Sequence, residues 1–236
     1  MKPLLFMGSL LLLATTSLAQ NCAYTFTFAA NAFAFCVSPY GTIGMIQSPI
    51  GTNQLNATTP VEGFEYIYVD ESGGGGSIFQ VPGIGSTDAG KPTFTQPNGA
   101  GKLPLIATWP AGFGLKETIT ANPMARQILI TFTITDCGAG CSYSGNFVRV
   151  AGPELDGQTT ANYAASGFAG IAYQNHGLLV ESTGPCGGIV QGTISDLTNA
   201  NCGGTPFTGT GGIFSQVFFA TVPNHHATMK FTYQVF

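Results

Sequence analysis

Apolar and polar residues alternate with a period of two along much of the chain, which predicts β-strands rather than helices. Tyr24, Phe26 and Phe28 share one face of a first expected strand, and residues 33–37 repeat the pattern. The strongest strand is expected at residues 126–136, where isoleucines and a phenylalanine line one face and threonines the other. Helical periodicity is almost absent, and a short helix is expected at most within residues 159–170.

Turn signals divide these strands. The strings SPYGT from Ser38 and SPIGT from Ser48 place proline second and glycine fourth, as in type I turns, and bracket a strand at 42–47. Residues 24–47 are therefore expected to form a meander, and the 126–136 and 143–150 strands a hairpin closed by the Cys137–Cys141 segment. The glycine- and proline-rich stretch between residues 81 and 114 is expected to form a long surface loop suited to function. The remaining strands are expected at residues 64–69, 77–81, 178–181, 188–194, 213–222 and 228–236.

About ten strands at this spacing predict an all-β fold, a single antiparallel β-sandwich. Residues 1–19 have the features of a signal peptide, with Lys2, an apolar run and small residues before the cleavage point. The sandwich domain is then expected to comprise residues 20–236. The expected location is secreted, extracellular or at the cell surface, with the periplasm as an alternative. No further segment has the length and apolarity of a membrane helix.

An even number of cysteines in an exported chain predicts disulfides. Six cysteines permit fifteen pairings, and their clustering favours local bridges. The favoured pairs are Cys22–Cys36, Cys137–Cys141 and Cys186–Cys202.

Charge is scarce: only 8% of residues are Asp, Glu, Lys or Arg, and the formal net charge is −4. A surface covered mainly by Thr, Ser, Asn and Gln has little long-range field, which argues against nucleic acid as a partner. A neutral glycan or a cell-surface component fits this composition better.

The most promising catalytic candidate is Glu65, in the acidic cluster of Glu62, Glu65, Asp70 and Glu71. If Glu65 lies on the face of Ile67 and Val69, an apolar environment would raise the pKa of its carboxyl and suit it to donate a proton in sugar hydrolysis. That chemistry needs a second carboxylate, whose position the sequence does not give. The simpler interpretation is an edge-strand carboxylate in water.

Two further kinds of site are weaker candidates. Asp70 and Glu71, beside four glycines, and Glu154 and Asp156, before Gly157, offer oxygen ligands for calcium, although no complete calcium loop is present. No cofactor other than calcium is suggested. Trp109 and Phe113 lie near the end of the glycine-rich stretch and could stack on a sugar or cap the sandwich.

Residues 33–69 carry the string FCVSPYG from Phe35 and a Glu62-Gly63-Phe64 strand start. This segment resembles secreted bacterial β-rich proteins of unknown function, in which an aromatic-Cys-Val strand runs into a glycine turn, a Ser-Pro-x-Gly turn and a Glu-Gly-aromatic strand. Residues 126–135 and 149–156 echo the same proteins, where an arginine precedes an acidic stretch. The resemblance implies export and β structure.

These features lead to two functional hypotheses. The first is a secreted, non-catalytic extracellular or cell-surface module that binds a neutral glycan or contributes to a surface structure. The second is a carbohydrate-active hydrolase that uses Glu65 with a second carboxylate.

Overall fold

The computed structural model describes residues 22–55, 62–70, 73–82, 85–110, 114–134, 143–154, 163–165, 168–173, 176–184, 186–191, 211–220 and 226–236. Within these residues the fold is all-β, and every strand pair is antiparallel. The described part contains no α-helix, and its complete helical element is one 3-10 turn, η1 (Ala29–Asn31). No helix there is long and apolar enough to cross a membrane. The signal peptide expected at 1–19 lies outside the described residues.

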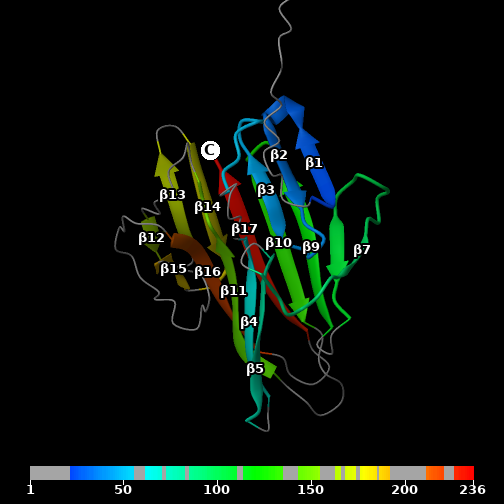
Figure 1. Cartoon of the computed structure of the whole chain (residues 1–236), viewed down its shortest axis with the longest axis vertical. Helices are drawn as coiled ribbons and strands as arrows, with labels where there is room; N and C mark the ends of the chain where they lie inside the picture. Colours follow the sequence, from blue (N-terminus) through cyan, green and yellow to red (C-terminus); the bar gives the residue numbers. More distant parts are fainter. Residues whose placement is uncertain are drawn as a thin grey trace, which may run out of the picture.

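The described strands form three sheets (Figure 1). The three-stranded sheet has the order β1-β2-β3: β1 (Tyr24–Phe28), β2 (Phe33–Val37) and β3 (Ile43–Gln47). The meander expected from the two turn signals is confirmed. The turn between β2 and β3 is closed by the Gly41 N–H, which donates to the Ser38 carbonyl at 3.1 Å.

The eight-stranded sheet has the order β12-β13-β14-β17-β10-β9-β8-β7. Its strands are β7 (Thr93–Thr95), β8 (Leu105–Thr108), β9 (Leu115–Asn122), β10 (Gln127–Ile134), β12 (Tyr163–Ala165), β13 (Phe168–Tyr173), β14 (His176–Ser182) and β17 (Ala227–Val235).

The six-stranded sheet has the order β15-β16-β11-β4-β5-β6. Its strands are β4 (Glu62–Asp70), β5 (Gly75–Val81), β6 (Ser86–Thr87), β11 (Tyr143–Ala151), β15 (Cys186–Gln191) and β16 (Gly211–Ala220).

The structure corrects several expectations. The described residues contain seventeen strands rather than about ten. β6, β7 and β8 occupy the stretch expected to be a loop, β9 follows that stretch, and β12 and β13 occupy residues that included the possible helix. The hairpin expected between residues 126–136 and 143–150 does not form. β10 pairs with β9 and β17, whereas β11 belongs to the other large sheet and pairs with β4 and β16.

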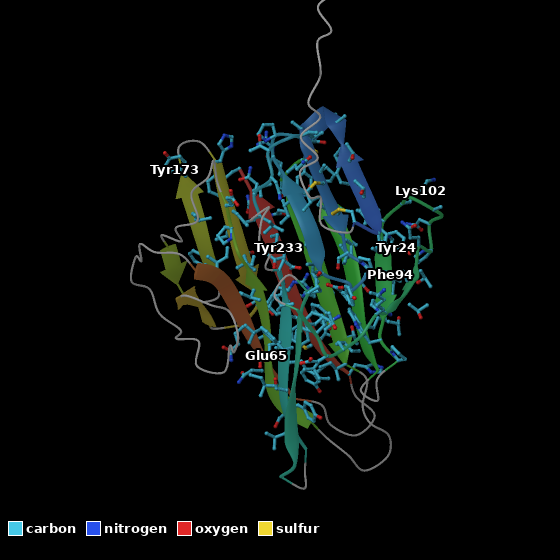
Figure 2. All side chains as sticks on the ribbon, viewed as in Figure 1. Tyr24, Glu65, Phe94, Lys102, Tyr173 and Tyr233 are labelled. Atoms are coloured by element: carbon cyan, nitrogen blue, oxygen red, sulfur yellow. A yellow bond between two sulfur atoms is a disulfide. The ribbon has the colours of Figure 1, made fainter. Side chains whose placement is uncertain are left out.

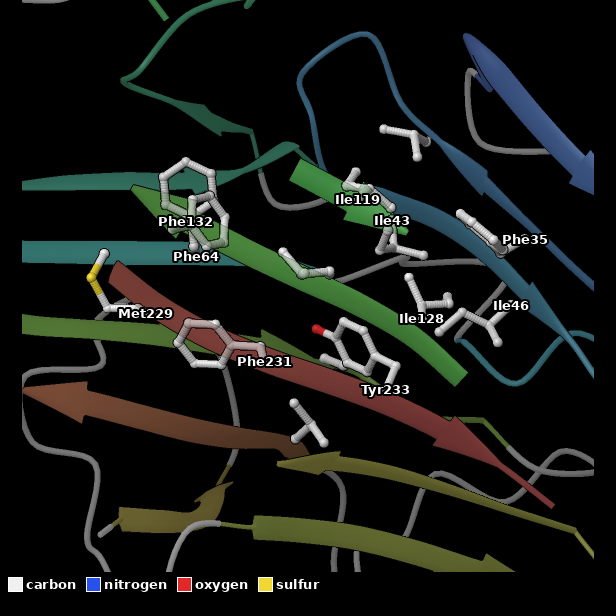
Figure 3. Packing of buried hydrophobic residues seen from close by; sticks show 14 of the residues in the cluster. Phe35, Ile43, Ile46, Phe64, Ile119, Ile128, Phe132, Met229, Phe231 and Tyr233 are labelled. Atoms are coloured by element: carbon white, nitrogen blue, oxygen red, sulfur yellow. The ribbon is translucent and has the colours of Figure 1, made fainter. Parts of the chain in front are cut away.

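The interior lies against one face of the eight-stranded sheet. The residues at alternate positions of β10, from Ile128 to Ile134, are fully buried, as the sequence predicted. Figure 3 shows that side chains of β2 and β3, including Phe35 and Ile46, lie at the Ile128 end of this row. Phe64 of β4 meets the Phe132 ring at the other end, with ring centroids 5.1 Å apart. Both smaller sheets therefore bury apolar side chains against the same face of the eight-stranded sheet.

The Cys22–Cys36 disulfide is present and links the chain before β1 to the middle of β2. The Cys137–Cys141 and Cys186–Cys202 pairings involve positions outside the described residues.

Candidate functional site

Glu65 lies near the middle of β4, which is flanked by β5 and β11 and is therefore not an edge strand. Its side chain shares a face with Ile67 and Val69, but only 3% of its surface is exposed (Figure 2). The Ser77 hydroxyl donates a hydrogen bond to Glu65 Oε1 at 2.8 Å. The interpretation as a water-exposed edge carboxylate is therefore wrong.

The nearest acid along the same strand, Glu62, cannot work with Glu65. Successive residues of a strand point to opposite faces, so an odd separation places the two carboxylates on opposite sides of the sheet. Glu62 shares the inner face with Phe64 and Tyr66, which are fully buried. The two acids that the sequence placed in one cluster are thus separated by the sheet itself.

Glu62 instead belongs to a buried ionic cluster, formed by Glu62, Glu117, Arg149 and Tyr233. Arg149 Nε donates to Glu62 Oε1 at 2.6 Å, and Arg149 Nη1 donates to Glu117 Oε1 at 2.8 Å. The Tyr233 hydroxyl also donates to Glu62 Oε1 at 2.6 Å. The backbone N–H of Ile43 donates to Glu62 Oε2.

Each sheet contributes to this cluster. Glu62 and Arg149 come from β4 and β11 of the six-stranded sheet, Glu117 and Tyr233 from β9 and β17 of the eight-stranded sheet, and the Ile43 N–H from β3. All four side chains are almost completely excluded from solvent. The cluster therefore sits where the three sheets meet, and it can join them but cannot receive a ligand from solvent.

Burial and charge together determine which groups are ionised. Burial raises the pKa of the Glu117 carboxyl to about 8; Arg149 opposes the shift and the charge of Glu62 adds to it. Burial also raises the pKa of the Glu62 carboxyl, against the attraction of Arg149. Burial disfavours the charged Arg149 guanidinium, but the two carboxylates outweigh it and raise its pKa. The pKa of the Tyr233 hydroxyl is raised by burial and by Glu62.

Glu62 is the carboxylate that we expect to be charged at neutral pH, because it accepts hydrogen bonds from Arg149, Tyr233 and Ile43. Glu117 is then protonated, and one anion balances one cation. Neutralising the second acid in this way avoids an uncompensated buried charge.

Gly41 allows the β2–β3 turn to approach this cluster closely. Its φ of +82° is one that residues with a side chain rarely adopt, and a Cβ there would lie 2.6 Å from Trp109 Cζ2 and 3.3 Å from Glu117 Oε2. Trp109 itself is buried, and its indole N–H donates to the Gly90 carbonyl at 3.2 Å. Trp109 is therefore a core residue, and its ring is not open to a sugar. Phe113 lies outside the described residues.

The calcium candidates are not brought together in the described part of the chain. Glu154 is half-buried and its backbone N–H donates to the Gln54 carbonyl at 2.9 Å. Asp70 ends β4, whereas Glu71 and Asp156 fall outside the described residues. No group of three or more His, Cys, Asp or Glu side chains with metal-binding geometry occurs among the residues that the structure describes.

The outer face of the eight-stranded sheet is open to solvent and rich in threonine. The threonines on one face of β10 were expected, but their alignment across neighbouring strands was not. Strand pairing aligns one row across five strands, β7 to β17, and a second row beside it. The first row is Thr93, Thr108, Lys116, Thr133 and Thr228, and the second is Thr95, Ile106, Thr118, Thr131 and Lys230. We call this surface the threonine face.

A hollow of about 180 Å³ opens in the threonine face where β14 leaves β17. Glu181 of β14 and Lys230 of the adjacent strand β17 both line this hollow, with Thr131, Thr232 and Leu129 around it. A second hollow, of about 290 Å³, lies between β1 and residues 101–103.

The comparisons with known proteins concern the fold. No protein-family model and no curated protein matches the sequence. A bacterial glucoamylase complexed with acarbose is similar in structure, with a TM-score of 0.61 and 12% identity over 92% of this chain and 32% of the glucoamylase chain. The Slr1438 protein from Synechocystis sp. PCC 6803 is similar with a TM-score of 0.53 and 9% identity, over 90% of this chain and 94% of its own. This chain thus corresponds to about a third of the glucoamylase and to nearly all of Slr1438.

Proposed function

We propose that the chain is a secreted, non-catalytic β-sandwich module that binds a neutral polysaccharide on its threonine face, at the extracellular or cell surface. The single observation that carries this proposal is the hollow lined by Glu181 and Lys230, beside rows of threonine hydroxyls. Export is supported by the features of residues 1–19 and by the Cys22–Cys36 disulfide, since such bonds persist in oxidising compartments. The resemblance to secreted bacterial β-rich proteins agrees with this location.

A neutral, hydroxyl-rich ligand suits the chemistry of the threonine face. Threonine hydroxyls both donate and accept hydrogen bonds, and in a sheet they recur about every 4.8 Å across strands and about every 6.7 Å along them. Glu181 supplies an acceptor and Lys230 a donor, so their charges offset one another within the hollow. The apolar side chain of Leu129, which is 37% exposed, offers a patch for the C–H face of a sugar ring.

The positions of the acids support the proposal of binding without catalysis. Glycoside hydrolysis needs two carboxyl groups about 5–10 Å apart on either side of the scissile bond. Among the described residues that line the hollow, Glu181 is the one carboxylic acid. Glu62 and Glu117 are bound to Arg149 in the interior, and Glu65 is buried beside Ser77.

The direct test is retention of the purified chain on insoluble polysaccharides, with starch, cellulose, chitin and xylan compared and released reducing ends measured together. Starch and free acarbose are included because one of the similar folds is part of a glucoamylase complexed with acarbose. We expect retention on at least one polymer and no released sugar.

Variants then locate the site. Glu181→Ala and Lys230→Ala are expected to weaken retention about tenfold each, because each removes a charged hydrogen-bonding group from the hollow. Lys116→Ala, on the same face but outside the hollow, is the matched control and should change retention less than twofold. Equal effects of all three variants would refute the site.

Sugar release that is lost in Glu65→Gln with unchanged folding would replace this proposal with the hydrolase hypothesis.

A further inference from the structure

β1 has one edge without a strand partner in the described sheets. The sheet order places it at the end of the three-stranded sheet, where it pairs with β2 alone. Edge strands of native proteins commonly carry charges, prolines or bulges that prevent a further strand from pairing. The sequence of β1, YTFTF, contains no charge and no proline, so its open edge lacks these protections.

The hollow of about 290 Å³ runs along this open edge. On one side it is lined by Thr25, Phe26, Thr27 and Phe28, which include residues from both faces of β1. No residue of β2 lines it, and its other wall is formed by residues 101–103. The hollow therefore lies beside β1, on the side away from β2, and has the form of a slot between a strand and a loop.

The loop wall is held in place by its own hydrogen bonds. Gln96 Nε2 donates to the Lys102 carbonyl at 2.9 Å, and Asn98 Nδ2 donates to the Leu103 carbonyl at 2.8 Å. The Gly101 N–H donates to Gln96 Oε1 at 3.1 Å. The ring of Tyr24, the first residue of β1, packs on the ring of Phe94 with centroids 4.8 Å apart (Figure 2). The slot is thus preformed, which lowers the entropic cost of binding.

Charge around the slot has one sign. Residues 22–55 contain no charged side chain, and Lys102 is the one charged residue that lines the slot. The ion pairs in the described part of the chain are those of Arg149 with Glu62 and Glu117. Among these described residues, no carboxylate lies within ion-pair distance of Lys102. A partner carrying a carboxylate would complement this ammonium group.

We propose that this slot binds an extended peptide segment of a partner protein, which pairs with β1 as an added strand and presents an acidic side chain to Lys102. An unpaired strand edge offers backbone donors and acceptors at the spacing of another peptide. The added strand would carry alternating side chains, one set beside the Phe26 face and the other beside Thr25 and Thr27.

The experiment uses the mature chain and four capped hexapeptides of alternating valine and threonine, each with one glutamate at position 2, 3, 4 or 5. Affinity is measured by calorimetry, and backbone amide exchange is followed by NMR. At saturation we expect exchange at amides within residues 24–28 to slow about tenfold with at least one peptide, because strand addition pairs that edge. The same peptides N-methylated at alternate amides should bind at least about tenfold more weakly, because they cannot form the ladder.

Lys102→Gln is expected to weaken binding about threefold at low salt and to reduce its salt dependence, as for an exposed ion pair. The matched control is Lys91→Gln, which removes a lysine that lies over the Tyr40 ring and outside the slot. Three results would overturn the proposal: no binding of any peptide at millimolar concentration, equal binding of the N-methylated peptides, or unchanged β1 amides at saturation. Concentration-dependent dimerisation that protects β1 without peptide would assign the edge to a second copy instead.

Discussion

Two neighbouring parts of the interior differ in chemistry: one consists of apolar side chains and the other contains buried charged groups. Beneath β1–β3 the core is apolar, with Phe33, Phe35, Ile43 and Ile46 fully buried in a segment that contains no charged residue. Where β3 meets β4, β9 and β11, the interior contains the buried ionic cluster. Figure 3 shows the hydroxyl of Tyr233, a member of this cluster, with Ile128 and Ile46 on one side and Phe64 and Phe132 on the other.

The two parts differ in how strictly their interactions depend on the relative positions of the sheets. Apolar burial stabilises roughly in proportion to area and tolerates small shifts of one sheet over another. The ionic cluster requires donors and acceptors from three sheets to meet within about 3 Å, as hydrogen bonds demand. We infer that the apolar part supplies most of the stabilising burial, whereas the cluster specifies how the sheets are placed. That specificity carries a penalty, because removing one partner leaves charge buried without compensation.

The largest effect is expected from Arg149→Met. This change keeps an apolar side chain of similar length but leaves Glu62 and Glu117 without their cation, so the free energy of unfolding should fall by about 3–5 kcal/mol at pH 7. Urea unfolding followed by tryptophan fluorescence gives the value. Arg126→Met is the control: Arg126 is half-buried and its Nη1 reaches the Ser48 hydroxyl at 3.3 Å, so we expect a loss below about 1 kcal/mol. Equal losses in the two variants would contradict the role of the cluster.

Glu117→Gln should change how stability depends on pH. The pKa of Glu117 is raised from 4.5 to about 8 in the folded protein, so between these values the unfolded chain releases a proton that the folded chain retains. Stability should therefore fall as pH rises through this window, by up to about 1.4 kcal/mol per pH unit from this group. Glutamine mimics the protonated acid, so the variant should lose this slope and be more stable than the parent at pH 8, by a few kcal/mol at most.

Unfolding curves at half-unit intervals from pH 4.5 to 8.5 test this. Glu181→Gln removes a carboxyl on the exposed side of β14 and serves as the control for the loss of one negative charge. A slope that persists in Glu117→Gln would show that Glu117 does not retain the proton.

The contribution of the apolar part to stability should depend on the Cys22–Cys36 disulfide and should not depend on pH. Replacing Cys22 and Cys36 together by alanine opens a loop with a sequence separation of 14 and should lower the free energy of unfolding by about 2–3 kcal/mol. Because no titratable group is removed, the loss should be the same at pH 5 and pH 8. A loss that varied with pH would mean that the two parts of the interior are not independent.

The sequence predicted those parts of the fold whose sequence patterns are local along the chain. The β1–β2–β3 meander was predictable because its turns are encoded between adjacent strands. The inner face of β10 was predictable because Ile128, Ile130, Phe132 and Ile134 alternate without interruption. The pairing of β10 was not, since its partner β17 lies about a hundred residues further along the chain and the cysteine-flanked turn suggested β11 instead.

The ionic cluster was missed for a related reason. Glu117 occupies a buried position between Leu115 and Ile119. Its charge interrupts the alternation of apolar and polar residues, so the sequence did not predict β9 as a strand. Glu62 shares the parity of Phe64, and Arg149 that of Phe147, so each charge sits on an apolar face. The sequence did contain a usable indication, namely acidic and basic residues at core positions of different strands. A buried charge needs a partner of opposite charge, and one arginine could pair with both acids. The distances between strands, which decide whether they meet, were not in the sequence.

The smallest change in stability is expected on the threonine face, which lies on the other side of the same strands. Thr131→Val alters a half-buried surface residue beside the hollow, and the free energy of unfolding should change by less than about 0.5 kcal/mol at any pH. Polysaccharide retention should nevertheless fall about threefold, because one hydroxyl at the hollow is lost. Thr93→Val, at the far edge of the same face on β7, is the matched control and should leave retention unchanged. Similar retention by both variants would separate the threonine face from binding, whereas a large loss of stability in Thr131→Val would mean that this face supports the fold as the interior does.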